Sequence, residues 1–181
     1  MSKLVEKKIS SQTVYKGNFL DVKKDNVVLP NGENSTREWI NHPGAVVIVP
    51  ILSNGEIALI RQFRYAMGSE FIELPAGKID KGETPDECAI RELEEEIGFK
   101  TKNLNFIAMI HPAIGFANEN MSLYLATDLV QTNINRDSDE FLELMPTSLE
   151  HALDLVWSNK ITDVKTIIGI LWYQKIYQES K

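Results

Sequence analysis

The stretch that decides the fold is residues 77–99, GKIDKGETPDECAIRELEEEIGF. Its middle predicts a helix over Pro85–Ile97, because Thr84 is a good N-cap, proline suits the first helical position, and Glu87 completes a capping box. Gly98 is placed to end this helix. Apolar residues at helical spacing form a stripe that we expect to face a core: Ala89, Ile90, Leu93 and Ile97.

The same segment is strongly acidic. Residues 83–96 hold seven carboxylates and one arginine, which accounts for six of the seven net negative charges of the 181-residue chain. Glu92 and Glu96 lie one helical turn apart, and Glu95 joins them at a spacing of three. A divalent cation would relieve the repulsion between them, and oxygen ligands without Cys or His suit Mg²⁺ or Mn²⁺. The plainer interpretation is a solvated helix face in which Arg91 pairs with Glu95.

The composition excludes several classes of protein. With 43% hydrophobic and 25% charged residues, the chain is typical of one globular domain. Its longest apolar run, residues 45–52, is too short to span a membrane, and residues 1–8 lack the apolar core of a signal peptide. The single cysteine, Cys88, allows no internal disulfide, and no basic surface favours nucleic acid. We therefore expect a cytoplasmic protein with neither a membrane nor a nucleic-acid partner.

Strands and two further helices are predicted around this segment. The expected strands are residues 19–29, 35–40, 46–51, 57–62, 70–74, 104–110, 122–127 and 141–145. Strands 46–51 and 57–62 flank an Asn-Gly turn and are expected to pair as a hairpin. One helix begins with a capping box at residues 147–150 and ends near Trp157, and another runs from about Asp163 to Tyr177. This mixture implies an α/β or α+β sandwich.

Residues 77–99 resemble the complete Nudix box, G-x5-E-x7-R-E-U-x-E-E-x-G-U, in which U is apolar. The fixed positions are filled by Gly77, Glu83, Arg91, Glu92, Glu95, Glu96 and Gly98. The resemblance implies a Nudix hydrolase, with a mixed-sheet α/β/α sandwich, that cleaves a nucleoside diphosphate linked to another group.

The resemblance also implies roles for individual residues. Glu92 and Glu96 become the leading metal ligands, joined by the backbone carbonyl of Ala76, and Glu95 supports them in catalysis. Arg91 and Glu83 would hold the loop against the helix by an ion pair. Metal ions in such a site neutralise the diphosphate and activate a water for attack on phosphorus.

Outside the box, the chain resembles the ADP-ribose pyrophosphatase branch of the family. The similar segments are residues 61–65, residues 70–77 and a proline-containing loop, residues 111–119, which ends in Glu119. The implied reaction is ADP-ribose plus water to AMP and ribose 5-phosphate. The substrate-binding residues expected from this branch are Arg37, Glu38, Arg64 and Glu119.

The physical reasons for these assignments differ. Arg37 and Arg64 suit phosphate groups, and Glu38 suits the adenine amine. Arg61 lies three residues before Arg64, so the two face opposite sides of a strand, and we favour Arg64. Trp39 either stacks on a base or packs in a core or interface.

The N-terminal strands fit this branch too. In related proteins such strands are exchanged between two subunits, which implies a homodimer whose sites are completed by the partner. The expected division is an N-terminal strand region over residues 1–42 and a Nudix hydrolase domain over residues 43–181.

An acidic loop, residues 136–140, matches the place where this branch carries a catalytic loop. Glu140 aligns with a glutamate that can approach the metals, both as a ligand and in catalysis. Relatives often have a second glutamate two residues earlier, where this chain has Ser138. The general base is therefore open among Asp137, Asp139, Glu140 and a box glutamate, and an ordinary solvated turn is the alternative.

Two other functions are consistent with the box. One is a broader nucleoside-diphosphate-sugar hydrolase that acts on GDP-mannose or ADP-glucose. The other is a non-catalytic sensor that binds ADP-ribose, although such proteins tend to lose the box carboxylates, which are all present here.

Overall fold

The structure, a computed structural model, describes residues 3–133 and 141–179, which divide into two units. The N-terminal unit comprises Met1–Gly44 and Ala113–Asn120, and the main unit comprises Ala45–Pro112 and Met121–Lys181. The boundary expected after residue 42 stays a prediction. Within the described ranges, no helix has the length and apolar character needed to cross a membrane.

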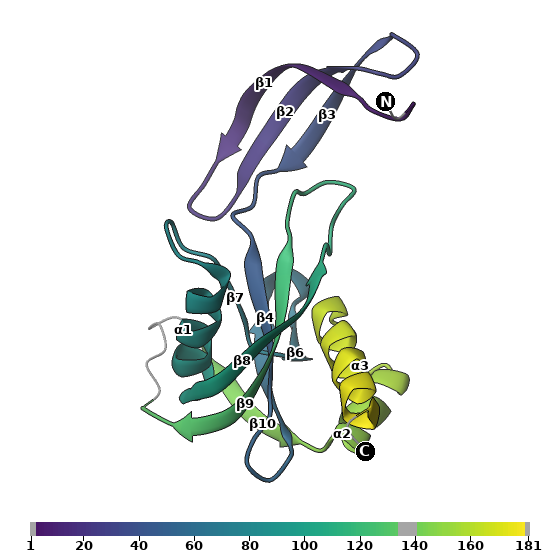
Figure 1. Ribbon diagram of the computed structural model, residues 1–181. Coiled ribbons are helices and arrows are strands. Elements are labelled where there is room, and N and C mark those ends of the chain that lie inside the picture. The colour runs from purple at the N-terminus through teal and green to yellow at the C-terminus, as the bar shows by residue number, and fades with distance from the viewer. Residues whose placement is uncertain (1–2, 134–140, 180–181) are drawn as a thin grey trace. The chain divides into compact units, whose positions relative to one another are not determined.

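The N-terminal unit contains an antiparallel sheet in the order β1-β2-β3 (Figure 1). Its strands are β1 (Lys7–Lys16), β2 (Asp21–Val28) and β3 (Asn34–Ile40). β2 and β3, which correspond to the strands expected over residues 19–29 and 35–40, pair across a turn in which the Gly32 N–H donates to the Leu29 carbonyl. Every residue of β1 is exposed, so its sequence carries no alternation that would have marked its bounds.

Two sheets form the main unit (Figure 1). The first, in the order β7-β4-β9-β8, is mixed, because β4 runs parallel to β9 while its other pairs are antiparallel. Its strands are β4 (Ala45–Pro50), β7 (Ala76–Lys78), β8 (Phe99–Ile110) and β9 (Met121–Gln131). The second, in the order β10-β5-β6, contains β5 (Ile57–Arg64), β6 (Ser69–Glu73) and β10 (Leu142–Thr147), with a 3₁₀ turn at Tyr65–Met67.

The hairpin predicted between β4 and β5 is wrong. The two strands belong to different sheets and are joined only by an isolated bridge between Ile51 and Ile57 among the described residues. One edge of β4 pairs with β9 along the whole strand, and on the other edge residues 45–47 pair with β7 and the Ile48 N–H donates to the Pro75 carbonyl, which leaves only the last residues of the strand for β5. The Asn-Gly turn therefore carries the chain from one sheet to the next.

The three predicted helices are present as α1 (Pro85–Ile97), α2 (Leu149–Trp157) and α3 (Val164–Glu179). The capping box of α1 has both of its hydrogen bonds, and Gly98 ends the helix at a φ of 71°, which favours glycine. The start predicted for α2 is wrong by one residue. Ser148 is its N-cap, and Thr147 belongs to β10.

Helices cover both faces of the mixed sheet, which confirms the α/β/α sandwich (Figure 1). Alternate residues of β4 explain this layering. Val46 and Ile48 pack with α1, whereas Val47 and Val49 pack with α2 and α3, so the whole strand is buried.

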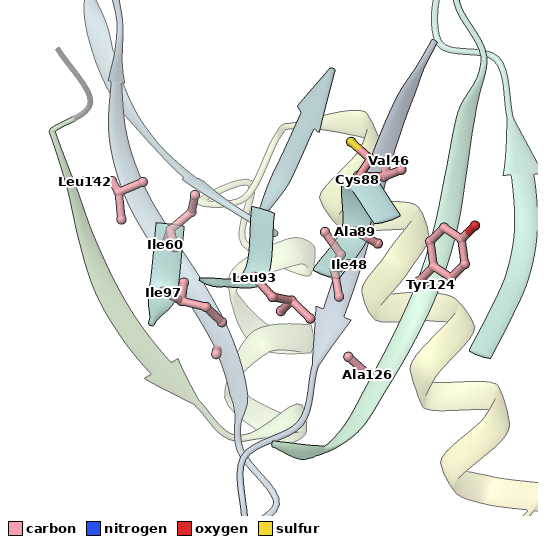
Figure 2. Close-up of a cluster of buried hydrophobic side chains, with 11 residues drawn as sticks. Val46, Ile48, Ile60, Cys88, Ala89, Leu93, Ile97, Tyr124, Ala126 and Leu142 are labelled. Carbon is pink, nitrogen blue, oxygen red and sulfur yellow. The ribbon is translucent and has the colours of Figure 1, made fainter. Parts of the chain in front are cut away.

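The core on the α1 face contains Leu93 and Ile97 of the predicted apolar stripe (Figure 2). Ile90 of that stripe is 39% exposed, and Cys88 is buried in the cluster instead. The apolar face of α1 is therefore rotated slightly toward Cys88 from the predicted position. This packing fixes which side of the helix presents its carboxylates.

Candidate active site

The acidic face of α1 lies against the short strand β7. Glu92 and Glu96 are buried, with 7% and 4% of their surface exposed. The Ala76 backbone N–H donates to Glu96 Oε2 at 3.1 Å. Gly77 leaves no room for a side chain, since a Cβ built there would lie 1.7 Å from Glu92 Oε1. A glycine is needed at this point because the Glu92 carboxylate packs directly onto the main chain.

Arg91 is the hub of the carboxylate cluster. Its Nε and Nη2 donate to the two oxygens of Glu83 at 2.8 and 3.0 Å. Its Nη1 donates to Glu92 Oε1 and to Glu95 Oε2, each at 2.8 Å. Nη2 also reaches the backbone carbonyl of Lys78 at 3.1 Å, so one side chain ties the loop before the helix to the helix itself.

Both interpretations of Arg91 from the sequence are therefore present together, the pair with Glu83 and the pair with Glu95. The hydrogen bond from Arg91 holds the pKa of Glu83 at about 2, well below the ordinary value. In return the carboxylates, Glu83 first, raise the pKa of Arg91. Glu83 is thus ionised at every pH at which the protein is expected to work.

The donor set fits a hard divalent cation. Glu83, Glu92 and Glu95 share one guanidinium, so these side chains carry an excess of negative charge, to which Glu96 adds. In the ranges that the structure describes, no three His, Cys, Asp or Glu side chains converge as a ready-made metal site. Mg²⁺ typically takes only one or two carboxylates, with waters and substrate phosphates completing its shell. Glu140 and the rest of the expected acidic loop lie outside the described residues.

Arg64 ends β5 beside this cluster. Its Nε and Nη2 donate to the two oxygens of Glu73 at 2.6 and 2.7 Å, a bidentate pair. That pair raises the pKa of Arg64, and the nearby charge of Glu96 contributes more weakly. Arg61 pairs instead with Glu143, as its odd spacing from Arg64 suggests.

The candidate residues of the N-terminal unit do not share a face. Adjacent residues of β3 alternate, so Arg37 lies opposite Asp25 of β2, and Glu38 lies opposite Lys24 on the other side of the sheet. Arg37 bonds to Glu6, and Glu38 forms a 3.5 Å ion pair with Lys24. The two therefore cannot act as neighbouring side chains on one surface of the sheet.

Glu119, also in the N-terminal unit, faces His42. Gly44 N–H donates to His42 Nδ1 at 3.1 Å, so Nε2 is the nitrogen that approaches Glu119 Oε1, at 3.7 Å. The backbone N–H of His42 donates to Asn118 Oδ1 at 2.7 Å, which ties the loop 113–120 to the end of β3. Glu119 is thus held by its own unit.

The sequence reasoning missed a buried ion network next to Arg64. Lys165 donates to Glu73 Oε2 and, at 2.9 Å, to Asp163 Oδ2. One feature of the sequence pointed to this network. Lys165 lies on the same helical face as Ile168 and Gly169, and a charged residue at a position facing the core is rarely buried without a partner.

The comparisons agree with this geometry. Residues 41–164 match the NUDIX domain, and residues 6–40 match the nucleoside diphosphate sugar hydrolase N-terminal domain. The chain is 40% identical to an ADP-ribose pyrophosphatase of Bacillus subtilis over 96% of its length and 95% of the relative's. It is 36% identical to a methanol dehydrogenase activator of Bacillus methanolicus, covering 96% of each chain.

A solved structure shares the fold over its whole length. A crystal structure of an ADP compounds hydrolase superposes with a TM-score of 0.89 at 25% identity, covering 99% of this chain and 98% of the other. The domain match spans more than half of the chain and includes every residue of the Arg91 cluster. With its intact box, its buried carboxylates and its relatives, the chain belongs to the Nudix hydrolase family.

Proposed function

We propose that this chain hydrolyses the diphosphate of ADP-ribose to AMP and ribose 5-phosphate with Mg²⁺, which Mn²⁺ could replace. The observation that carries the proposal is the pair of buried carboxylates, Glu92 and Glu96, one turn apart against Ala76 and Gly77. The names of the relatives, an ADP-ribose pyrophosphatase and an ADP compounds hydrolase, support the choice of substrate.

In this proposal Glu92, Glu96 and the Ala76 carbonyl hold the metal, with Glu140 as a further ligand. When bound, Mg²⁺ supplies charge neutralisation for the diphosphate and lowers the pKa of a coordinated water. Arg91 fixes the carboxylates of Glu92 and Glu95 in one orientation, which reduces the reorganisation needed in the transition state.

The proton of the attacking water needs an acceptor. Glu95 is suited to this role, because its side chain is more exposed than those of Glu92 and Glu96 and is oriented by Arg91. Glu140 is the second candidate. Replacing each by Gln separates them, since loss of the general base lowers kcat far more than it raises KM.

In this proposal Arg64, in the main unit, binds the diphosphate. Arg37, Glu38 and Glu119 are the proposed substrate-binding residues of the N-terminal unit. Because Arg37 and Glu38 face opposite sides of their sheet, at most one of them contacts a given ligand from one subunit. A homodimer, in which a second copy supplies the other, and a cytoplasmic location stay predictions.

A broader specificity is the second candidate. The N-terminal segment matches a domain named for nucleoside diphosphate sugar hydrolases, and one relative is the mouse ADP-sugar pyrophosphatase, 32% identical over 71% of this chain. The carboxylate cluster acts on the diphosphate and is compatible with either specificity.

The test is a substrate panel with purified protein, Mg²⁺ and an EDTA control. It compares ADP-ribose, ADP-glucose and GDP-mannose, with products separated by chromatography. A strong preference for ADP-ribose, yielding AMP, is expected, whereas similar rates for all three would favour the broad hydrolase. Binding of ADP-ribose without metal-dependent cleavage would overturn the proposal and favour a sensor.

Two variants of α1 provide the matched comparison. Glu92→Gln should reduce kcat by about 100- to 1,000-fold, the range for loss of one electrostatic contact to the transition state. Glu94→Gln removes a negative charge two residues further along the same helix. Among the described residues the Glu94 side chain pairs only with Lys100, so this variant should retain activity. Equal activity in the two variants would contradict the assignment of Glu92 as a metal ligand.

A further inference from the structure

Four charged side chains alternate in sign beside the proposed site. Arg64 bonds to Glu73, Glu73 to Lys165, and Lys165 to Asp163. They join the end of β5, the end of β6 and the start of α3, and their formal charges sum to zero. No part of the hydrolysis described above uses Lys165 or Asp163.

The centre of the network is buried, and each charge there has more than one partner. Lys165 and Glu73 are both more than nine-tenths buried, and a buried ion pair is maintained only where each charge has its partners. Asp163 also accepts hydrogen bonds from Thr166, from the backbone N–H at 3.1 Å and from Oγ1 at 2.6 Å. Burial alone would raise the pKa of Glu73, but the Arg64 hydrogen bonds and the Lys165 charge outweigh it and keep the carboxyl ionised.

The exposed end of the network is the guanidinium of Arg64. Glu73 occupies its Nε and Nη2, and no acceptor for Nη1 is found among the residues that the structure describes. A pocket of about 220 Å³ opens here, lined by Arg64, Met67, Phe71, Glu73, Asp163 and Lys165. An anion in this pocket could therefore approach Arg64 through a nitrogen that Glu73 leaves unused.

We propose that Lys165 is a positioning residue for the diphosphate, acting through Glu73 on Arg64. The two carboxylates of this network, Glu73 and Asp163, would outweigh Arg64 by one negative charge if Lys165 were absent, and they would then oppose the approach of a diphosphate. Lys165 neutralises that excess and shares the Glu73 carboxylate, so Arg64 keeps its orientation and its guanidinium can attract phosphate.

The role is distinct from that of the metal-binding carboxylates. Lys165 touches neither the substrate nor the box glutamates in this proposal, and its effect travels through one shared carboxylate. Removal of Lys165 leaves the remaining three side chains with a net charge of −1 beside the diphosphate. The expected consequence is weaker substrate binding with an unchanged chemical step.

The inference rests on the proposed function and is tested on the full-length protein with Mg²⁺. Lys165→Met should raise KM for ADP-ribose about tenfold, within the range of coupling between contacting charged residues, and change kcat by less than about threefold. Lys165→Arg, which can still donate to Glu73 and Asp163, should restore most of the affinity. Lys175→Met removes a lysine from the exposed side of the same helix and should leave KM unchanged.

The decisive measurement is a double-mutant cycle with Arg64→Ala. If Lys165 acts through Arg64, then Lys165→Met should add no further increase in KM once Arg64 is absent. Additive effects, or an unchanged KM in Lys165→Met, would overturn the inference while leaving the hydrolase proposal intact.

Folding is checked by thermal unfolding of each variant. If Lys165→Met fails to fold, Lys165→Gln, whose amide N–H groups can still donate but carry no charge, takes its place with the same expected increase in KM. A wild-type protein that leaves ADP-ribose intact would overturn the proposed function, and this inference with it.

Discussion

A methyl group added at Gly77, in the variant Gly77→Ala, should lower the catalytic activity of this protein more than its stability. The Cβ of an alanine there would lie 1.7 Å from Oε1, 1.9 Å from Cδ and 2.5 Å from Oε2 of Glu92. Ordinary van der Waals contact begins near 3.4 Å. Either the Glu92 carboxylate or the β7 main chain must therefore move by about 1.7 Å, the difference between the two distances.

The size of the effect follows from that displacement. A misplacement of about 1 Å in a catalytic group can cost about 100-fold in rate, so Gly77→Ala should lower kcat/KM by at least about 100-fold, or about 2.7 kcal/mol. The shift also breaks the 2.8 Å bond between Arg91 and Glu92. A charge-assisted hydrogen bond contributes about 1.5–3 kcal/mol, and the reduced entropy of the unfolded chain offsets about 0.4–1 kcal/mol.

The assay compares kcat/KM for ADP-ribose with the free energy of unfolding from urea titration. Gly169→Ala is the matched control, because its Cβ would lie 2.3 Å from Leu74 Cδ1 in the core on the α3 face. It should reduce stability without moving Glu92, so its folded fraction should keep normal kcat/KM. Near-normal activity in Gly77→Ala would refute the placement of Glu92 against the main chain.

Three further outcomes are expected. Thr84→Ala removes the hydroxyl that caps α1 and that bonds to Glu87, but keeps the backbone N–H that donates to the Glu87 carboxylate, and should cost about 1 kcal/mol in urea unfolding. Burial raises the pKa of Cys88 to about 12, so its alkylation by iodoacetamide at pH 8 should be slow in the folded protein and fast in urea, and rapid labelling under native conditions would contradict its burial. Arg91 lowers the pKa of Glu83 to about 2 from 4.5, so this pair stabilises the folded state fully above pH 4.5 and progressively less as the pH falls toward 2. The stability advantage of wild type over Glu83→Gln should therefore shrink across that window in acid titrations followed by circular dichroism, and a constant difference would argue against the pair.

The helix α1 and its chemistry could be predicted from the sequence because their signals are local. A cap, a first-turn proline, a terminal glycine and the spacing of apolar and acidic residues all lie within residues 77–99. Helical geometry alone then places Glu92 and Glu96 one turn apart. The prediction of a sandwich of helices and strands also came from local patterns, since the spacing of apolar residues differs between strands and helices.

Strand partners and the exact faces of elements depended on the tertiary structure. Pairing of β4 with β9 rather than β5 joins segments far apart in the sequence, and no local turn signal carries that information. The rotation of α1 that buries Cys88 and exposes Ile90 likewise depends on what the sheet presents to the helix.

Around the candidate active site, too, some features follow from local sequence and others from long-range packing. The sequence by itself determined that a row of carboxylates would follow Gly77 on one helix, because three- and four-residue spacings are set by the backbone. Only the tertiary structure decided that Glu92 packs against Gly77 and that Lys165, 92 residues from Glu73 along the chain, shares its carboxylate. Contacts of this kind depend on long-range packing, because a buried charge is tolerable only where folding brings its partner to it.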